Sequence, residues 1–347
     1  MASLRLATCR ILLAGFAIVR LARISIVSQL PACCGQLHCR RSPECQCYPV
    51  KQASVWSEGW IVQTILITGA SSGFGAHVAA KLAARGWRVI ASMRDTTKTK
   101  QLDELMGGAG TNTELLEIIR LDVACDESRA SAVDYVLDST PHGLTAVLHC
   151  AGYTTAGFFE HLAPQTIRDL LETNFIGAVD VTQRLLPAMR SQGHGTIAVV
   201  SSNAVNIAHP MYSIYAAAKW ALEGWAEAID IELAPFGLDV KILQPGNHDT
   251  LFGRNVQPVL PEDSPYAPLA ATALPRMSKL GSRARPTEKA AVEICDALES
   301  DSRQLRVRLG HDDKVMAALS RWAPYTVRRR IVERITGIDK MTLFPAR

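Results

Sequence analysis

Residues 61–75, IVQTILITGASSGFG, decide the fold of this 347-residue chain. The first seven residues are largely apolar and β-branched, as expected of a strand that is buried on both faces of a sheet. The glycine-rich stretch Thr68–Gly75 follows at once, and the apolar residues of Ala76–Arg85 have helical spacing. A strand, a glycine turn and a helix in this order predict the first βα unit of a nucleotide-binding fold.

The same alternation continues along the chain. Six more apolar runs are predicted to be strands: Trp87–Met93, Leu116–Leu121, Ala146–Cys150, Thr196–Ser201, Val240–Leu243 and Leu305–Leu309. Helical periodicity is found in Ser128–Asp138, Pro164–Ser191 and Tyr215–Ala234. Alternating strands and helices favour parallel pairing with right-handed crossovers. We therefore predict the α/β class, with one Rossmann-type doubly wound domain over residues 61–310.

Two later segments depart from this rhythm. Residues 251–286 are rich in proline and short polar residues, and we interpret them as a long irregular lid loop over the site. Residues 311–347 are predicted to form a C-terminal helical extension, with two helices over Val315–Ile335 interrupted at Pro324.

Residues 1–60 form an N-terminal extension with two interpretations. The first 43 residues hold six arginines and no acidic residue, which is typical of an organelle-targeting peptide. We favour the other interpretation, an extension dispensable or absent from the translated protein, with Val62 marking the start. The apolar run Ile11–Val19 is too short for a membrane span, which needs about 20 residues.

Charge and cysteine usage exclude several partners. The formal net charge is +4 and is concentrated in the extension, so no nucleic-acid partner is predicted. The cysteines lack paired C-x2-C spacing, and His149, His209 and His248 lack ligand spacing, so no metal site is predicted. Cysteines scattered through the body suit a reducing interior, and we expect a cytoplasmic protein.

The end of the second predicted strand indicates which nucleotide is bound. An acidic residue there would hold the free ribose hydroxyl of NAD, but this chain has Met93 followed by Arg94. A guanidinium suits the 2′-phosphate of NADP through charge-assisted hydrogen bonds. We therefore predict NADP(H) as cofactor, with NAD(H) bound through Asp95 as the alternative.

The segment YAAAK indicates a catalytic pair. Tyr215 and Lys219 are four residues apart, so they lie on one helical face. A tyrosine with its ordinary pKa of ~10 is a weak acid–base group at neutral pH, and a nearby positive charge lowers that pKa. Ser202, thirteen residues upstream at a strand end, strengthens this interpretation.

Together these motifs resemble the short-chain dehydrogenases/reductases over about residues 62–310. The resemblance implies that Tyr215 exchanges a proton, Ser202 holds the substrate carbonyl, Lys219 lowers the tyrosine pKa and binds ribose, and Asn174 supports a water. It implies a cofactor site made of Gly69, Ser71, Ser72, Gly73, Phe74, Gly75, Arg94, Asp122, Val123, Ala151, Gly152, Tyr215, Lys219, Pro245, Gly246 and Thr250.

Three short sequence motifs indicate which branch of the family the chain resembles. ASMRD, KWALEG and LAPFG are similar to the branch with 17β-hydroxysteroid dehydrogenase type 1 and the retinol dehydrogenases. Two positions depart from the family: Cys150 replaces an asparagine that ties strands together, and Val205 replaces a common glycine beside the substrate pocket.

The function implied is hydride transfer between NADP(H) and a lipophilic secondary alcohol or ketone, in a homodimer or homotetramer. Two alternatives stay open: a non-catalytic NADP(H)-binding regulatory protein, and a reductase of carrier-bound acyl chains. Arg283 and Arg285 are the local hint of the latter.

Overall fold

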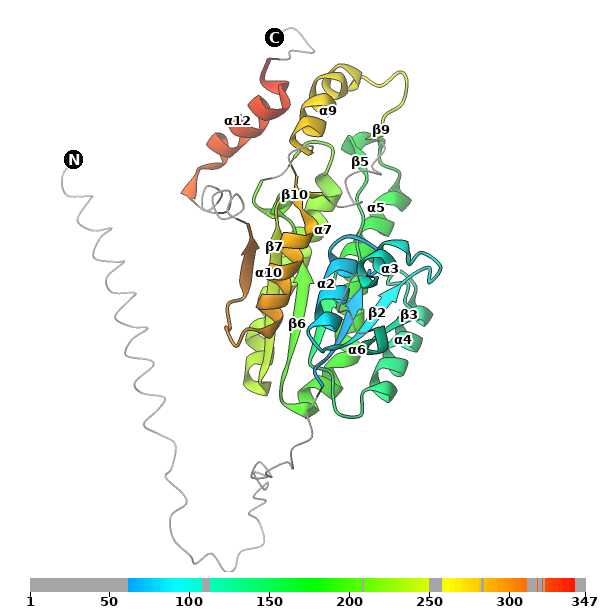
Figure 1. Ribbon diagram of the computed structural model, residues 1–347. Coiled ribbons are helices and arrows are strands. Elements are labelled where there is room, and N and C mark those ends of the chain that lie inside the picture. The colour runs from blue at the N-terminus through cyan, green and yellow to red at the C-terminus, as the bar shows by residue number, and fades with distance from the viewer. Residues whose placement is uncertain are drawn as a thin grey trace, which may run out of the picture. The chain divides into compact units, whose positions relative to one another are not determined.

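Seven parallel strands form the central sheet, in the order β11-β7-β6-β4-β1-β2-β3 (Figure 1). The computed structural model describes residues 62–107, 113–207, 209–249, 258–281, 284–310, 317, 320 and 322–340. All seven predicted strands are confirmed: β1 Thr64–Thr68, β2 Arg88–Met93, β3 Leu116–Arg120, β4 Ala146–His149, β6 Gly195–Val200, β7 Leu238–Pro245 and β11 Arg306–Leu309.

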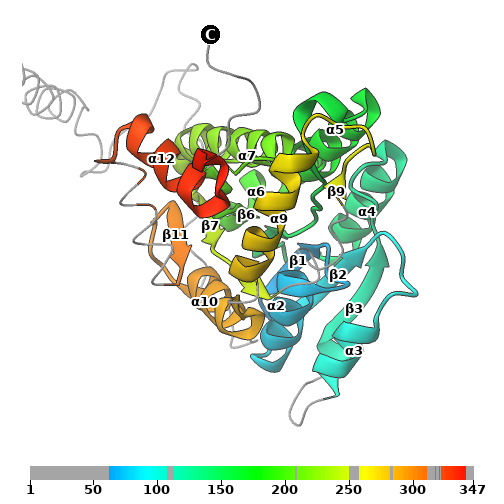
Figure 2. The ribbon, with the colours of Figure 1, turned by 90° about the horizontal axis from the view of Figure 1, so that it is seen from above.

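Helices cover both faces of this sheet, because successive side chains of each strand point to opposite sides. Ile65 and Ile67 of β1 pack with α2 (Gly73–Ala84), α3 (Lys100–Met106) and α10 (Thr287–Glu299). Leu66 packs on the other face, which is covered by α4 (Asp126–Ser139), α6 (Gly177–Gln192) and α7 (Ser213–Leu233). Figure 2 shows the two helix layers with the strands between them. The predicted Rossmann-type α/β fold is confirmed.

The strand order places a crevice at the centre of the sheet. The chain runs from β1 outward to β2 and β3, then returns to β4 on the other side of β1. Helices that follow β1 and β4 therefore lie on opposite faces, and the carboxyl ends of these two strands border an open switch point. In folds of this kind, nucleotides bind there.

The helix predicted over Pro164–Ser191 contains a change of helix type. α5 (Pro164–Leu171) passes into five π-helical residues, η3 (Glu172–Ile176), before α6 begins. Such π segments are often found at functional sites, because they accommodate an extra residue within a helix. Asn174 lies inside this segment.

The prediction of an irregular lid over residues 251–286 is wrong in its central part. α9 (Ala267–Gly281) forms there, with Ala270 buried in a small apolar cluster. Pro268 stands in the first turn of α9, where a missing amide N–H does no harm, although Pro275 lies inside the helix. Residues 250–257, 282 and 283 are outside the described residues, and with them Thr250 and Arg283.

Short elements complete the described structure. Two-residue strands pair in parallel: β5 (Ala156–Gly157) with β9 (Pro258–Val259), and β8 (His248–Asp249) with β10 (Arg285–Pro286). The 3-10 turns are η1 Thr113–Leu115, η2 Phe159–His161, η4 Asn203–Val205, η5 Ala234–Phe236 and η6 Ile338–Lys340.

The C-terminal helix α12 (Tyr325–Thr336) begins directly after Pro324, as predicted. The helix expected before Pro324 and the N-terminal extension fall mainly or wholly outside the described residues. Figure 1 shows α9 and α12 at the end of the sheet to which the strands point. Within the described part of the chain, no helix is long and apolar enough to cross a membrane.

Candidate active site

The glycine turn after β1 packs tightly against the segment after β4. Gly69 has φ +70°, and a Cβ there would lie 2.7 Å from the backbone of Ala151. A Cβ on Gly75 would collide with the carbonyl oxygen of Gly69. The lack of side chains at these positions lets the turn bring a ligand to the first amides of α2, where the helix dipole favours phosphate.

Thr68 ties β1 to β4 in a chain that lacks the expected asparagine. Its Oγ1 accepts hydrogen bonds from the backbone N–H groups of Cys150 and Ala151, both at 3.2 Å. Cys150 packs against the apolar core, and burial raises the pKa of its thiol to about 12. The thiol therefore stays protonated at neutral pH, which fits the interpretation of Cys150 as a packing residue.

Two charged residues follow β2: Arg94, which is exposed, and Asp95, whose carboxylate is hydrogen-bonded within its own loop. The Asp95 carboxylate accepts hydrogen bonds from the Thr97 hydroxyl at 2.7 Å and the Thr97 N–H at 3.1 Å. These bonds lower the pKa of Asp95 and hold its carboxylate in a local turn. Asp95, the residue that would bind the ribose of NAD in the alternative prediction, thus already has hydrogen-bond partners within its own loop.

Two further residues contact the glycine turn: Gln101, which the sequence did not indicate, and His248, which lies within the predicted cofactor loop after β7. Gln101 of α3 accepts a hydrogen bond from the Gly73 N–H at 3.1 Å, at the first turn of α2. His248 meets the Phe74 ring edge-on, with ring centroids 5.5 Å apart. The position of His248, three residues after Pro245, was a usable signal, whereas the contact of Gln101 depends on packing between two helices.

The loop after β3 is held by hydrogen bonds to α4 and within the loop itself. Asp122 donates its N–H to Ser128 Oγ at 2.9 Å, and its Oδ1 accepts from the Ala124 N–H at 3.1 Å. The Val123 carbonyl accepts from Arg129 Nη1 at 2.7 Å. Asp122 and Val123 therefore lie in a rigid loop at the same sheet edge as the glycine turn.

Ser202, Tyr215 and Lys219 come together at the end of β6. Ser202 begins the η4 turn and is hydrogen-bonded to Tyr215. Lys219 Nζ donates to the carbonyl of Val200, the last residue of β6, at 2.8 Å, and lies 5.9 Å from the centroid of the Tyr215 ring. The spacing along α7 places both groups against one strand end, as the sequence predicts.

The pKa values at this site differ from the expectation that Lys219 lowers that of Tyr215. Burial raises the pKa of Tyr215 to about 12, and the hydrogen bond with Ser202 opposes this rise. Burial lowers the pKa of Lys219 to about 8, and Glu223 opposes that fall. Desolvation is the main cause in both cases because it favours the neutral form of each group.

Asn174 connects the segment after β4 to α5 by hydrogen bonds. Its Nδ2 donates to the carbonyls of Tyr153 at 3.0 Å and Leu170 at 2.9 Å, and its Oδ1 accepts from the Tyr153 N–H at 3.2 Å. A Cβ on Gly152 would lie 2.6 Å from Asn174 Oδ1 and 3.8 Å from Lys219 Nζ. Both amide hydrogens of Asn174 are used by backbone groups, so a water could meet only the second lone pair of Oδ1.

A buried charge network lies behind the site. The Glu223 carboxylate accepts hydrogen bonds from Ser201 Oγ at 2.5 Å, Gln244 Nε2 at 2.7 Å and Arg306 Nε at 3.1 Å. Ser201 follows β6 directly, and Gln244 and Arg306 belong to β7 and β11, so the network fixes α7 against three neighbouring strand regions.

An apolar cluster joins the segment before Tyr215 to α9. Phe158, Met211 and Ala270 are buried together, and the Phe158 ring stacks on Tyr266 at 4.5 Å. Met211 has φ +71°, an uncommon conformation for a residue with a side chain. Its carbonyl accepts the Gly157 N–H at 2.9 Å, which holds this conformation beside Tyr212.

No group of three or more metal-ligating side chains is found among the described residues. The three histidines singled out in the sequence have separate surroundings. His149 is buried with its Nε2 2.8 Å from Thr182 Oγ1, and burial lowers its pKa to about 3. Burial also lowers the pKa of His209 and of His248.

Comparison with known proteins assigns the family. Residues 63–259 match the short chain dehydrogenase family, and the chain belongs to it. An uncharacterised oxidoreductase of Bacillus subtilis, YusZ, is 32% identical over 78% of this chain and 96% of its own length. Human 17-beta-hydroxysteroid dehydrogenase type 1 is 33% identical over 55% of this chain and 58% of its own length.

A solved structure supports the same assignment. A short-chain dehydrogenase from Streptomyces avermitilis superposes with a TM-score of 0.66 at 31% identity, over 81% of this chain and all of the other. The protein is thus an oxidoreductase with a nucleotide-binding Rossmann fold.

Proposed function

We propose that this protein is an NADP(H)-dependent dehydrogenase/reductase that interconverts a secondary alcohol and a ketone. The observation that carries the proposal is the hydrogen bond between Tyr215 and Ser202, with Lys219 buried behind them at the end of β6. These residues lie at the carboxyl edge of the sheet, where the glycine turn faces the same crevice.

The residues at the switch point fit a dinucleotide. Gly69 and Gly75 leave a cradle that any Cβ would fill, and the Phe74 amide lies in the first turn of α2, next to the Gly73 amide that donates to Gln101. The exposed Arg94 suits a 2′-phosphate, whereas Asp95 is occupied by Thr97. This contrast favours NADP(H) over NAD(H). When bound, the nicotinamide supplies or takes up a hydride.

Side chains of this protein donate the proton to the substrate and orient the substrate oxygen. A pKa near 12 keeps the Tyr215 hydroxyl protonated at neutral pH, so Tyr215 can donate its proton to a ketone oxygen during reduction. Ser202 aligns the same oxygen by a hydrogen bond. A positive charge held at Lys219 would favour the phenolate formed after donation. Asn174 keeps Gly152 and the cofactor-side backbone in place.

The surroundings of the site favour a lipophilic substrate. Phe158, Met211 and Ala270 are buried together, so apolar contacts join the segment between Ser202 and Tyr215 to α9. Human 17-beta-hydroxysteroid dehydrogenase type 1 and retinol dehydrogenase 8, both 33% identical over part of the chain, are named for lipophilic alcohols. We propose a substrate of that character.

Cofactor choice is tested by fluorescence titration of NADPH and NADH. We expect NADPH to bind at least about tenfold more tightly, a difference of about 1.4 kcal/mol, and Arg94→Ala to remove the difference. Arg120→Ala serves as a control for a basic residue at the end of the neighbouring strand. Equal binding of both nucleotides to the wild type would contradict the choice of NADP(H).

The chemistry is tested separately with a panel of lipophilic ketones. Tyr215→Phe should abolish turnover while leaving NADPH binding within about threefold of the wild type, because only the proton donor is lost. A wild-type protein that binds NADPH but reduces none of the ketones, with Tyr215→Phe behaving identically, would favour a regulatory role.

A further inference from the structure

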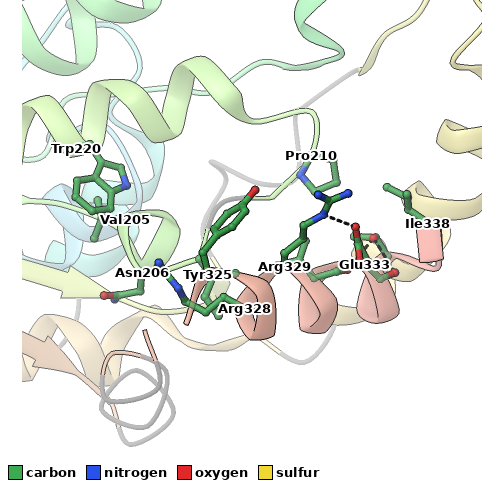
Figure 3. Close-up of a pocket in the computed structure, with 12 residues that line it drawn as sticks. Val205, Asn206, Pro210, Trp220, Tyr325, Arg328, Arg329, Glu333 and Ile338 are labelled. Carbon is green, nitrogen blue, oxygen red and sulfur yellow. Dashed lines mark hydrogen bonds and ion pairs between the residues drawn. The ribbon is translucent and has the colours of Figure 1, made fainter. Parts of the chain in front are cut away.

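A groove of about 290 Å³ lies between α12 and the segment that follows Ser202 (Figure 3). The segment contributes Val205 and Ile207, which are only 7% and 5% exposed. Trp220 of α7 and Tyr325 of α12 also line the groove, and their side chains are 58% and 69% exposed. The groove therefore has an apolar floor and two accessible aromatic walls.

Within the described part of the chain, one cation of this groove has no ion-pair partner. Arg329 Nε is paired with Glu333 at 2.6 Å, and the dashed line in Figure 3 marks this contact. Arg328 also lines the groove, and its Nε is buried without a hydrogen-bond partner in the described part of the chain. A buried donor of a charged group is costly when unpaired and gains strongly from an anionic acceptor.

We propose that this groove binds an amphipathic ligand with an unbranched apolar chain and one carboxylate, held by Arg328. Apolar chain atoms would lie on Val205, Ile207 and Val332, which suits a small groove at the low end of the range of ligand sites, ~300–1,000 Å³. Guanidinium pairs with a carboxylate through two parallel hydrogen bonds. Arg329 and Glu333 neutralise each other, so the groove offers one net positive charge.

The site is separate from the predicted nucleotide site. None of its lining residues belongs to the glycine turn, to Arg94 or to the loop after β7. The inference therefore does not depend on hydride transfer. It assigns to the chain a ligand other than the nucleotide, bound against the segment that begins with Ser202 and includes Val205, the position that the sequence places beside the substrate pocket.

Isothermal titration of the full, nucleotide-free chain with decanoate tests the proposal. Decanoate, below the concentration at which it forms micelles, should bind, whereas decyltrimethylammonium, with the same chain and the opposite charge, should not. Arg328→Gln should weaken decanoate binding at least about tenfold. Arg330→Gln makes the same charge change at an exposed position outside the groove and should leave the affinity unchanged.

Several outcomes would overturn the inference. Equal weakening by Arg328→Gln and Arg330→Gln would show general charge attraction by α12. Equal binding of the ammonium compound would show apolar adsorption without carboxylate recognition. Binding of neither compound, with self-association that depends on Trp220, would show that a second copy occupies the groove. If Arg328→Gln fails to fold, Val332→Asp supplies the test, since a carboxylate in the groove should abolish decanoate binding.

Discussion

Ser201 Oγ donates a hydrogen bond of 2.5 Å to Glu223 Oε1, which joins the residue before Ser202 to α7 two turns beyond Tyr215. Lys219 lies between them on the same helical face, and the Glu223 charge raises its pKa against the effect of burial. The end of β6 and α7 are thus held together through a buried carboxylate.

Replacing this carboxylate should destabilise the protein. Glu223→Gln keeps the shape but removes the charge that faces Arg306 and accepts from Ser201 and Gln244. We expect the free energy of unfolding to fall by about 1–3 kcal/mol in urea titrations. Glu227→Gln removes the exposed partner of the same arginine and should change stability by less than about 0.5 kcal/mol. Equal effects of the two variants would contradict a special role for the buried partner.

Stability should rise with pH through the titration of Lys219. Its pKa is about 8 in the folded protein and 10.5 ordinarily, so the unfolded chain binds more protons between these values. Stability therefore increases from about pH 8 to about pH 10.5. Tyr215 acts in the opposite sense above pH 10, because its folded pKa is raised to about 12.

The variant Lys219→Met isolates this effect. Between about pH 7.5 and about pH 9.5, the wild type should gain about 2 kcal/mol of unfolding free energy relative to Lys219→Met. Lys98→Met, at an exposed lysine, should parallel the wild type. Parallel pH profiles of the wild type and Lys219→Met would show that Lys219 is not desolvated.

Arg129 should be among the most sensitive positions outside the site. Its guanidinium is buried and donates to Val123 O, Glu172 Oε1 and Asp180 Oδ2 at 2.7–2.8 Å. Arg129→Met leaves Glu172 and the Val123 carbonyl without this donor, while Asp180 keeps Arg184, and should cost about 1–3 kcal/mol of stability in urea unfolding. Arg184→Met removes a more exposed cation from the same Asp180 and should cost less than about 1 kcal/mol.

Gly152→Ala should impair function more than stability. The added Cβ would stand 2.6 Å from Asn174 Oδ1, so Asn174 must move from the Tyr153 backbone. We expect NADPH affinity to fall at least about tenfold in fluorescence titration, while the far-ultraviolet circular dichroism spectrum is retained. Gly224→Ala, where a Cβ meets open space within α7, should bind normally and gain up to about 1 kcal/mol of stability. Unchanged NADPH binding by Gly152→Ala would contradict the tight packing at Asn174.

The sheet could be predicted because the local sequence of each strand is mainly apolar. Thr64–Thr68 and Ala146–His149 are short, mainly apolar segments, typical of a strand that is buried on both faces. The proximity of Tyr215 and Lys219 could be predicted equally well, because helical spacing alone places them on one face.

Other features depend on contacts that no local pattern encodes. Two prolines in Ala267–Gly281 suggested a loop, but burial of Ala270 and Ala273 outweighs them. The partners Glu223 and Arg306 are 83 residues apart, and nothing in either neighbourhood predicts the other. The pKa of Tyr215 also follows from burial in the folded chain, which spacing to Lys219 does not reveal.

The π-helical segment Glu172–Ile176 sets the rotation of α6 about its axis relative to α5. Each residue turns an α-helix by about 100°, so one extra residue accommodated here rotates all of α6 relative to α5. Deleting a single residue would restore a regular helix and swing Asn174 away from the Tyr153 backbone, although every strand of the sheet would keep its sequence. The number of residues between α5 and α6 therefore determines how the two helices are rotated relative to each other, whatever their side chains are.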